Sequence, residues 1–384
     1  MAALQHLQFL LGDHGTGDVI CWSHSASNVA GTLLVETCLL AAKAADSWSA
    51  LLVASGECRR LFRVLSGVTG ETKNTVRWYA WFTVVRQIRL FPKIIRQLAD
   101  NAELGCDKLR AKLARAMDKE GLRLETALVD DAASPLVCFF YEMEGDGFLA
   151  PICYDLRTAV VEHEKRTTGR FNPLGPPLKP VCPLLEAEIL KGLPLPADQA
   201  RRDALLIEVA SKAHLMFDKV NDDTRVGGRL FGQSQLMRAA RLSNFVETSK
   251  HGIPALTTEI ETYIQVLDRT RHDLVQLLVT DLKAYHTACV VEVAALDRDA
   301  AGLPVKQTPE KLWAFWNRNA MNLPVWYRAA KGVAIILTSS GCAERVFALY
   351  TSVADVSQES ALEDRVESSV MLKFNNKQRE MLDA

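Results

Sequence analysis

Residues 308–347 read TPEKLWAFWNRNAMNLPVWYRAAKGVAIILTSSGCAERVF. Thr308 followed by Pro309 indicates a helix start, because threonine caps helix N-termini and proline is favoured at the first helical position. The segment that follows is rich in aromatic residues, with Trp313 and Trp316 on the predicted helix. The Leu-Pro pair at 323–324 then marks a turn before Trp326. This stretch therefore predicts a helical C-terminal region that buries large aromatic side chains.

A further helix is predicted from Ser339 and Ser340 onward, since serine is a favoured helix cap. Apolar residues then recur at three- and four-residue spacing, which makes one side of that helix apolar: Cys342, Val346, Leu349, Tyr350 and Val353. A second apolar stripe follows a polar loop: Leu362, Val366, Val370 and Phe374. Such stripes are buried either against their own domain or against a second copy of the chain.

These features resemble a known family, the hAT superfamily of DNA transposases. The Trp-rich helix, the Leu323-Pro324-Val325-Trp326 turn and the block from Ser339 to Phe347 are similar to its C-terminal dimerisation region. This chain departs from the family at Thr338, where proline is common. The resemblance implies self-association through these residues: Trp313, Trp316, Trp326, Val346, Phe347, Leu349, Leu362, Val366, Val370 and Phe374.

The N-terminal part contains a second pair of motifs that resembles the same family. Cys21-Trp22-Ser23-His24 ends a short predicted strand at Val19–Trp22, and Arg77-Trp78 follows downstream. Cys21 and His24 alone do not make a zinc site, which needs a second pair of ligands, so they are interpreted as a thiol and an imidazole at a strand end. The resemblance implies that Arg77 and Trp78 contact DNA; a buried aromatic is the alternative interpretation of Trp78.

The resemblance also implies a catalytic centre, and the chain supplies only part of it. Family members cut DNA with an RNase H-like fold in which two aspartates and one glutamate hold two divalent metals. Glu344 corresponds to the glutamate by its place in the Ser-Ser block. Asp13 and Asp18 lie in a glycine-rich segment and are interpreted as turn residues. We therefore expect no catalysis and no cofactor, with Mg²⁺ or Mn²⁺ bound only if the triad were intact.

Composition sets further bounds on the function. The net charge is −1 and the apolar fraction is 48%, which is typical of a globular protein whose DNA contacts would have to come from local patches. The 9 cysteines show no paired spacing and are interpreted as reduced thiols. No apolar run is long enough to span a membrane, and no secretory signal is evident. A nuclear location follows from the resemblance, and a cytoplasmic one without it.

The long middle of the chain is predicted to be helical. Lys108–Arg115 is a basic helix interpreted as a solvated face, because acidic residues surround it. A second basic cluster contains Arg225 and Arg229, followed by Arg238 and Arg241, and it is a candidate DNA contact. The proline-rich segment 172–196 is predicted to be a loop or an extended connector.

Together these patterns predict a mainly α protein. Residues 1–98 would be the remnant of an RNase H-like core with few strands, without the zinc finger and first strands of the family. Residues 99–305 would be an all-helical insertion, and residues 306–384 the dimerisation region. Three functions remain open: a non-catalytic transposase derivative that acts by dimerisation, a derivative that binds DNA at transposon ends, and an unrelated helical scaffold.

Overall fold

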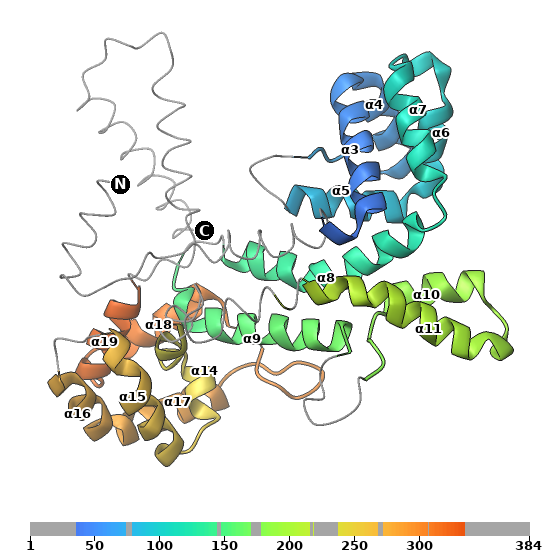
Figure 1. The fold of residues 1–384 in the computed structure, drawn as a ribbon. Helices are drawn as coiled ribbons and strands as arrows, with labels where there is room; N and C mark the ends of the chain where they lie inside the picture. The colour runs from blue at the N-terminus through green and yellow to red at the C-terminus, as the bar shows by residue number, and fades with distance from the viewer. Residues whose placement is uncertain are drawn as a thin grey trace, which may run out of the picture.

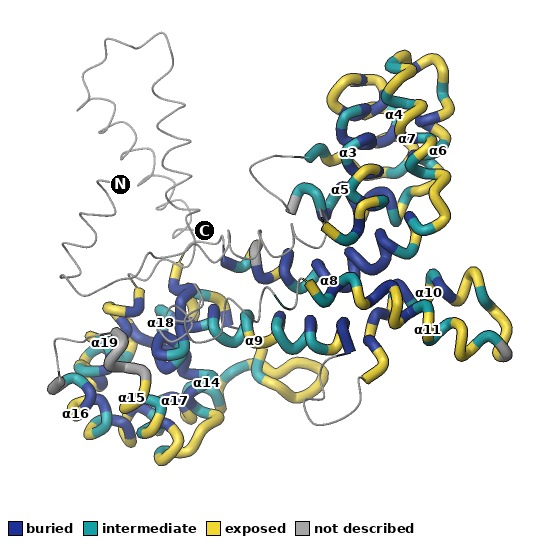
Figure 2. The backbone as a smooth tube through the Cα atoms, viewed as in Figure 1, coloured by how far each residue is buried: buried dark blue, intermediate teal, exposed yellow. Residues whose placement is uncertain are grey.

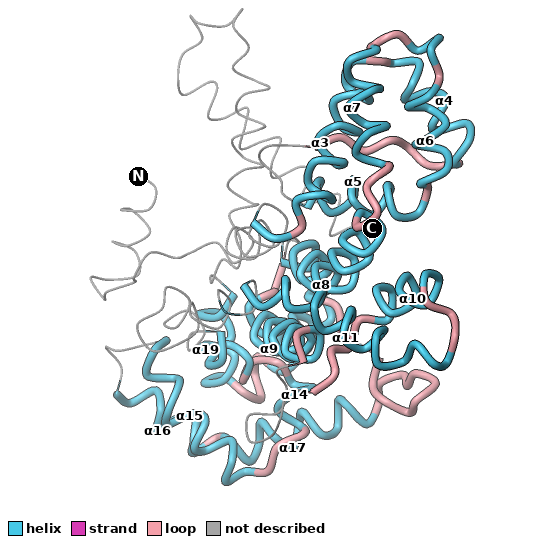
Figure 3. The backbone as a smooth tube through the Cα atoms, turned by 45° about the vertical axis from the view of Figure 1, so that its right-hand side comes forward, coloured by secondary structure: helices cyan, strands magenta, loops and turns pink. Residues whose placement is uncertain are grey.

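The computed structural model describes residues 36–73, 79–143, 147–169, 178–215, 218, 237–267, 272–305 and 307–334. Across these ranges the chain is helical, as Figures 1 and 3 show. The only strand-like pairing among them is an isolated antiparallel bridge between Arg298 and Pro304. The predicted mainly α fold is therefore confirmed. The predicted strand at 19–22 lies outside the described residues, so an RNase H-like core stays a prediction.

The helices form two bundles joined by a pair of longer helices (Figure 1). The N-terminal bundle contains α3 (Leu39–Ala54), α4 (Gly56–Ser66), α5 (Tyr79–Leu90), α6 (Pro92–Asp100) and α7 (Asp107–Met117). The connecting helices are α8 (Leu122–Met143) and α9 (Ala150–Thr167), and α8 also carries the hairpin of α10 (Pro183–Gly192) and α11 (Gln199–Ala210). The C-terminal bundle contains α14 (Phe245–Ser249), α15 (Ile253–Leu267), α16 (His272–Thr280), α17 (Leu282–Ala294), α18 (Pro309–Asn319) and α19 (Pro324–Ala334).

Local signals divide the N-terminal bundle into short helices. The Ser55 side chain accepts a hydrogen bond from the Cys58 amide at 3.1 Å, which caps α4 and separates it from α3. Pro92 occupies the first turn of α6, where its missing N–H is not needed. The bundle closes around Trp48, which is fully buried and meets Phe62 edge-on at a centroid distance of 5.0 Å.

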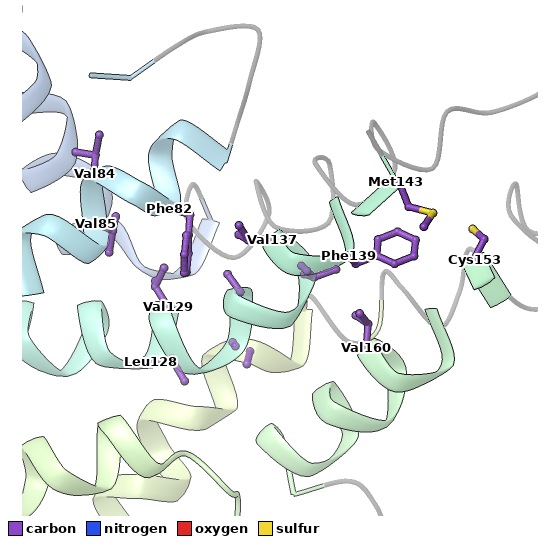
Figure 4. Packing of buried hydrophobic residues seen from close by; sticks show 14 of the residues in the cluster. Phe82, Val84, Val85, Leu128, Val129, Val137, Phe139, Met143, Cys153 and Val160 are labelled. Atoms are coloured by element: carbon purple, nitrogen blue, oxygen red, sulfur yellow. The ribbon is translucent and has the colours of Figure 1, made fainter. Parts of the chain in front are cut away.

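The helix α8 lies at the centre of the molecule, because it packs against α5, α9 and α10. Figure 4 shows Phe82 of α5 beside Val129 of α8, and Phe139 of α8 close to Val160 of α9. The helix α9 reaches the C-terminal bundle, where it contacts α19. Figure 2 shows that the buried residues lie on the inward sides of the helices and the exposed ones on the outside. None of the helices in the described ranges has the length and apolarity required to cross a bilayer.

The prediction of an irregular connector at 172–196 is wrong for part of that segment. Residues Pro183–Gly192 form the helix α10, and Pro196 begins a single 3₁₀ turn. Pro183 stands in the first turn of α10, where proline is compatible with a helix, and the next proline is Pro194, beyond its end. The density of prolines therefore misled the prediction, because their positions flank the helix.

Candidate functional site

The predicted aromatic residues Trp316 and Trp326 lie in the core of the C-terminal bundle. Both belong to the largest fully or nearly fully buried side chains, at 0% and 2% exposed. Both rings stack on Tyr285, whose ring centroid lies 5.2 Å from that of Trp316 and 4.1 Å from that of Trp326. The Trp316 indole N–H also donates to the Ser243 carbonyl at 2.9 Å. These two tryptophans are covered by residues of their own chain, so their burial requires no second copy.

Trp313 differs from its two neighbours, because it is only partly buried. Its ring lies 5.2 Å from the ring of Phe148 and 6.1 Å from that of Tyr327. The start of α18 is as predicted: the Thr308 side chain accepts from the Lys311 amide, and Pro309 follows in the first turn. Of the three tryptophans assigned to self-association, Trp313 is the one with surface left for a partner, and that assignment stays a prediction.

The remaining predicted site residues lie outside the described part of the chain. They are Cys21, His24, Arg77, Trp78, Arg225, Arg229, Glu344, Val346, Phe347, Leu349, Leu362, Val366, Val370 and Phe374. Within the described ranges, no group of three or more His, Cys, Asp or Glu side chains is arranged to hold a metal ion.

The arginines of the second basic cluster that the structure describes are engaged with acidic residues. Arg238 contacts Glu259 at 2.5 Å, and Arg241 lies between Asp155 at 2.7 Å and Glu247 at 3.3 Å. Both line a groove of about 330 Å³ between the 237–241 helical turn, α14 and α15. Burial raises the pKa of Asp155 to about 6, although the Arg241 guanidinium acts in the opposite direction. The contacts of these two arginines are therefore internal ion pairs.

Buried carboxylates on α8 form hydrogen bonds and an ion pair with other parts of the chain. Glu125 is 5% exposed, and its Oε2 accepts hydrogen bonds from the backbone amides of Leu40 at 2.8 Å and Ala41 at 3.1 Å. Its other oxygen meets the Lys212 ammonium at 2.7 Å. The residue at the N-cap of α3 is Cys38, whose side chain makes no capping hydrogen bond. Glu125 therefore supplies, from another helix, the cap that the local sequence lacks.

Asp131 does the same for α10. Its two carboxylate oxygens accept from the amides of Leu184 at 3.2 Å and Leu185 at 2.9 Å, while the N-cap residue Cys182 provides no side-chain cap. Burial raises the pKa of the Asp131 carboxyl to about 6, and the two backbone hydrogen bonds act in the opposite direction. Burial also raises the pKa of the Cys182 thiol, and Asp131 beside it contributes.

Pro135 interrupts the backbone hydrogen bonds of α8, and His163 of α9 compensates for the missing donor. Proline has no N–H, so the carbonyl of Asp131, four residues earlier in α8, has no helical donor. The His163 Nε2 lies 2.8 Å from that carbonyl oxygen and fills the missing place as a donor. Burial lowers the pKa of His163, which favours a neutral ring with its proton on Nε2. The imidazole thus joins α9 to the proline site of α8.

Glu164, the next residue on α9, is the most unusual polar group of the core. It is 0% exposed, and neither carboxylate oxygen has a hydrogen-bond partner. The Thr167 hydroxyl, one turn along the same helix, also has no partner, while the Cys182 thiol donates to the Thr167 carbonyl at 3.4 Å. Burial raises the pKa of Glu164 well above its ordinary value of 4.5. A neutral carboxylic acid is the form that this environment accepts.

Replacing Glu164 with glutamine should stabilise the protein relative to wild type, and this difference in the free energy of unfolding should grow as the pH rises. Because the folded pKa exceeds the unfolded one, folding binds a proton above about pH 4.5, and wild-type stability falls by up to about 1.4 kcal/mol per pH unit until the folded pKa is reached. The amide of Glu164→Gln does not titrate, so its advantage should grow over that window. Urea unfolding at a series of pH values measures the difference.

The half-buried neighbour Glu162, which pairs with Lys165 at 2.8 Å, provides the matched control. The variant Glu162→Gln removes from the same helix a carboxylate that is not fully buried, so it should not reproduce the stability gain of Glu164→Gln. A constant difference for Glu164→Gln would show that Glu164 does not take up a proton on folding.

Two features of the sequence indicate these buried acids, although the spacing of apolar residues does not. Glu125, Asp130 and Asp131 stand inside the apolar run of α8, and Asp130 pairs with Arg89, whose Nε donates at 2.6 Å. Cysteine at the helix starts 38 and 182, where Ser, Thr, Asp or Asn is usual, was the second signal. A helix that lacks its own cap has free backbone amides, and a carboxylate in an apolar segment requires hydrogen-bond donors, so each can satisfy the other.

Comparison with known proteins gives no relative for this arrangement. No family model, no curated protein and no solved structure matches the chain.

Proposed function

We propose that this protein is a non-catalytic, transposase-derived helical protein that acts by self-association. The proposal rests on the resemblance of residues 308–376 to the hAT dimerisation region, together with the way α18 and α19 are held. Trp316 and Trp326 anchor these two helices in the C-terminal bundle, so α19 is packed against the bundle up to its end at Ala334.

The sequence that follows α19 supports a second copy of the chain as the partner. It carries the apolar stripe of Cys342, Val346, Leu349, Tyr350 and Val353, and the stripe that ends at Phe374. Two such helices per chain can supply the roughly 1,200 Å² or more of total buried surface that a stable interface requires. The observation that carries the proposal is this pair of apolar stripes in the sequence. They follow directly after α18 and α19, whose Trp316 and Trp326 are already buried within the chain.

Replacing Leu349 or Phe347 with aspartate should abolish self-association. A carboxylate introduced into an apolar interface would be desolvated without a partner, which costs several kcal/mol and shifts the equilibrium to monomers. Sedimentation velocity over a range of protein concentrations measures the change, with circular dichroism to confirm that the variants are folded.

The matched control is Thr351→Asp, on the opposite side of the same predicted helix from Leu349. It should self-associate like the wild type. A wild-type chain that stays monomeric at micromolar concentration would contradict the proposal, as would an undiminished dimer in Leu349→Asp.

A further inference from the structure

Positive charge is concentrated in the N-terminal bundle. Residues 56–117 contain 13 Lys and Arg against 5 Asp and Glu, a net charge of +8, in a chain whose total is −1. Such an asymmetry within one chain is typical of a protein with a polyanionic partner.

The outer side of α7 and the turn that follows it present part of this charge as a row. Lys108, Lys112, Arg115 and Lys119 follow one another at intervals of four, three and four residues, and all four are exposed. This spacing places Lys108, Lys112 and Arg115 on one side of α7, over a length of about 10 Å. Lys119 lies two residues beyond the end of α7, in the turn that follows. The opposite side of α7 is apolar, with Leu113 fully buried in the bundle.

Three of the acidic residues around this row pair with other cations, whereas Glu103 and Glu120 are exposed. Asp107 pairs with Arg110 at 2.5 Å, and Arg96 of α6 takes both Asp100 at 3.0 Å and Asp118 at 2.8 Å. Among the described residues, no acidic side chain pairs with any of the four cations in the row. The only contact of their side chains there is from Arg115, whose Nε donates to the carbonyl of Ala111 in its own helix. The four cations are therefore exposed, as the interpretation of this helix as a solvated face expects, and none of them is in an ion pair within the described residues.

We propose that the row of Lys108, Lys112, Arg115 and Lys119 binds the phosphate backbone of a nucleic acid without reading its bases. A row of cations that have no acidic partner among the described residues matches a line of phosphates, and release of counterions from the nucleic acid drives the contact. A membrane surface fits less well, because the exposed side of α7 has no large apolar side chain to insert, and its Leu109, Ala114 and Met117 pack against the core. This surface is separate from the C-terminal stripes, so the inference goes beyond the proposed self-association and does not depend on it.

The test is fluorescence anisotropy of the full chain with labelled duplex DNA and, in a second arm, duplex RNA, each of arbitrary sequence, at increasing NaCl. Four phosphate contacts predict a slope of log K against log[NaCl] of about −3 to −4. The variant with all four residues changed to glutamine should weaken binding and reduce the slope by about 1 per cation removed. The arm with the tighter binding identifies which nucleic acid the surface prefers.

A second quadruple variant removes the same charge from exposed, paired cations outside α7: Lys179→Gln, Lys191→Gln, Lys250→Gln and Arg318→Gln. It should bind like the wild type, with circular dichroism to confirm folding of both variants. Equal weakening by the two variants would overturn the proposal, because only net charge would then matter. Absence of binding at low salt, or binding through the row to phosphatidylserine vesicles alone, would overturn it too.

Discussion

Replacing Trp316 with alanine is expected to lower the free energy of unfolding by about 3–5 kcal/mol, the range for removing a large aromatic from a core. The indole is fully buried, stacks on Tyr285 and donates to the Ser243 carbonyl at 2.9 Å. Alanine would leave a cavity in the C-terminal bundle and a carbonyl without its donor. Urea unfolding followed by circular dichroism measures the loss.

Trp313→Ala is the matched control, because Trp313 lies on the same helix but is only partly buried. Its loss should be clearly smaller. The effect of Trp316→Ala should also be independent of protein concentration, since every partner of Trp316 belongs to the same chain. A loss that appears only on dilution would instead place Trp316 at an interface between two copies.

Replacing Glu125 with alanine is expected to cost about 2–4 kcal/mol, because two backbone amides at the start of α3 would lose their acceptor and Lys212 its partner. Each buried donor left unsatisfied costs about 1–3 kcal/mol. The damage should be concentrated at the α3 terminus, where Cys38 offers no substitute cap. Hydrogen exchange of the Leu40 and Ala41 amides, together with urea unfolding, measures both effects.

Glu125→Gln separates the cap from the charge, because the amide oxygen can still accept hydrogen bonds from α3 while the ion pair with Lys212 is lost. It should lose less stability than the alanine variant and keep the two amides protected. Equal losses for the two variants, with no change in exchange at Leu40 and Ala41, would contradict the role of Glu125 as a cap.

The helical class and the start of α18 could be predicted from the sequence. Thr308-Pro309 marked the start of α18, and the long middle of the chain was predicted to be helical. Proline gave mixed results: Pro92 and Pro183 begin helices, while Pro135 lies inside one. Its effect depends on whether a donor from elsewhere, here His163, satisfies the carbonyl that it leaves free.

The candidate site was less predictable, because its contacts join distant parts of the chain. Glu125 caps a helix 85 residues away, and Asp131 one that is 53 residues away. Arg238 and Arg241 looked like a basic cluster in the sequence, and only the folded chain brings Glu259, Asp155 and Glu247 to them. The charge of a segment does not show which of its cations remain unpaired.

The sequence by itself determined that this chain is mainly helical and where α18 begins, since a capping residue and a proline act within one helical turn. The tertiary structure alone decided that Trp316 and Trp326 face inward, that α8 supplies caps to α3 and α10, and that Glu164 is buried without a partner. The physical reason is that burial and hydrogen bonding between helices depend on which surfaces meet, and no local pattern specifies that.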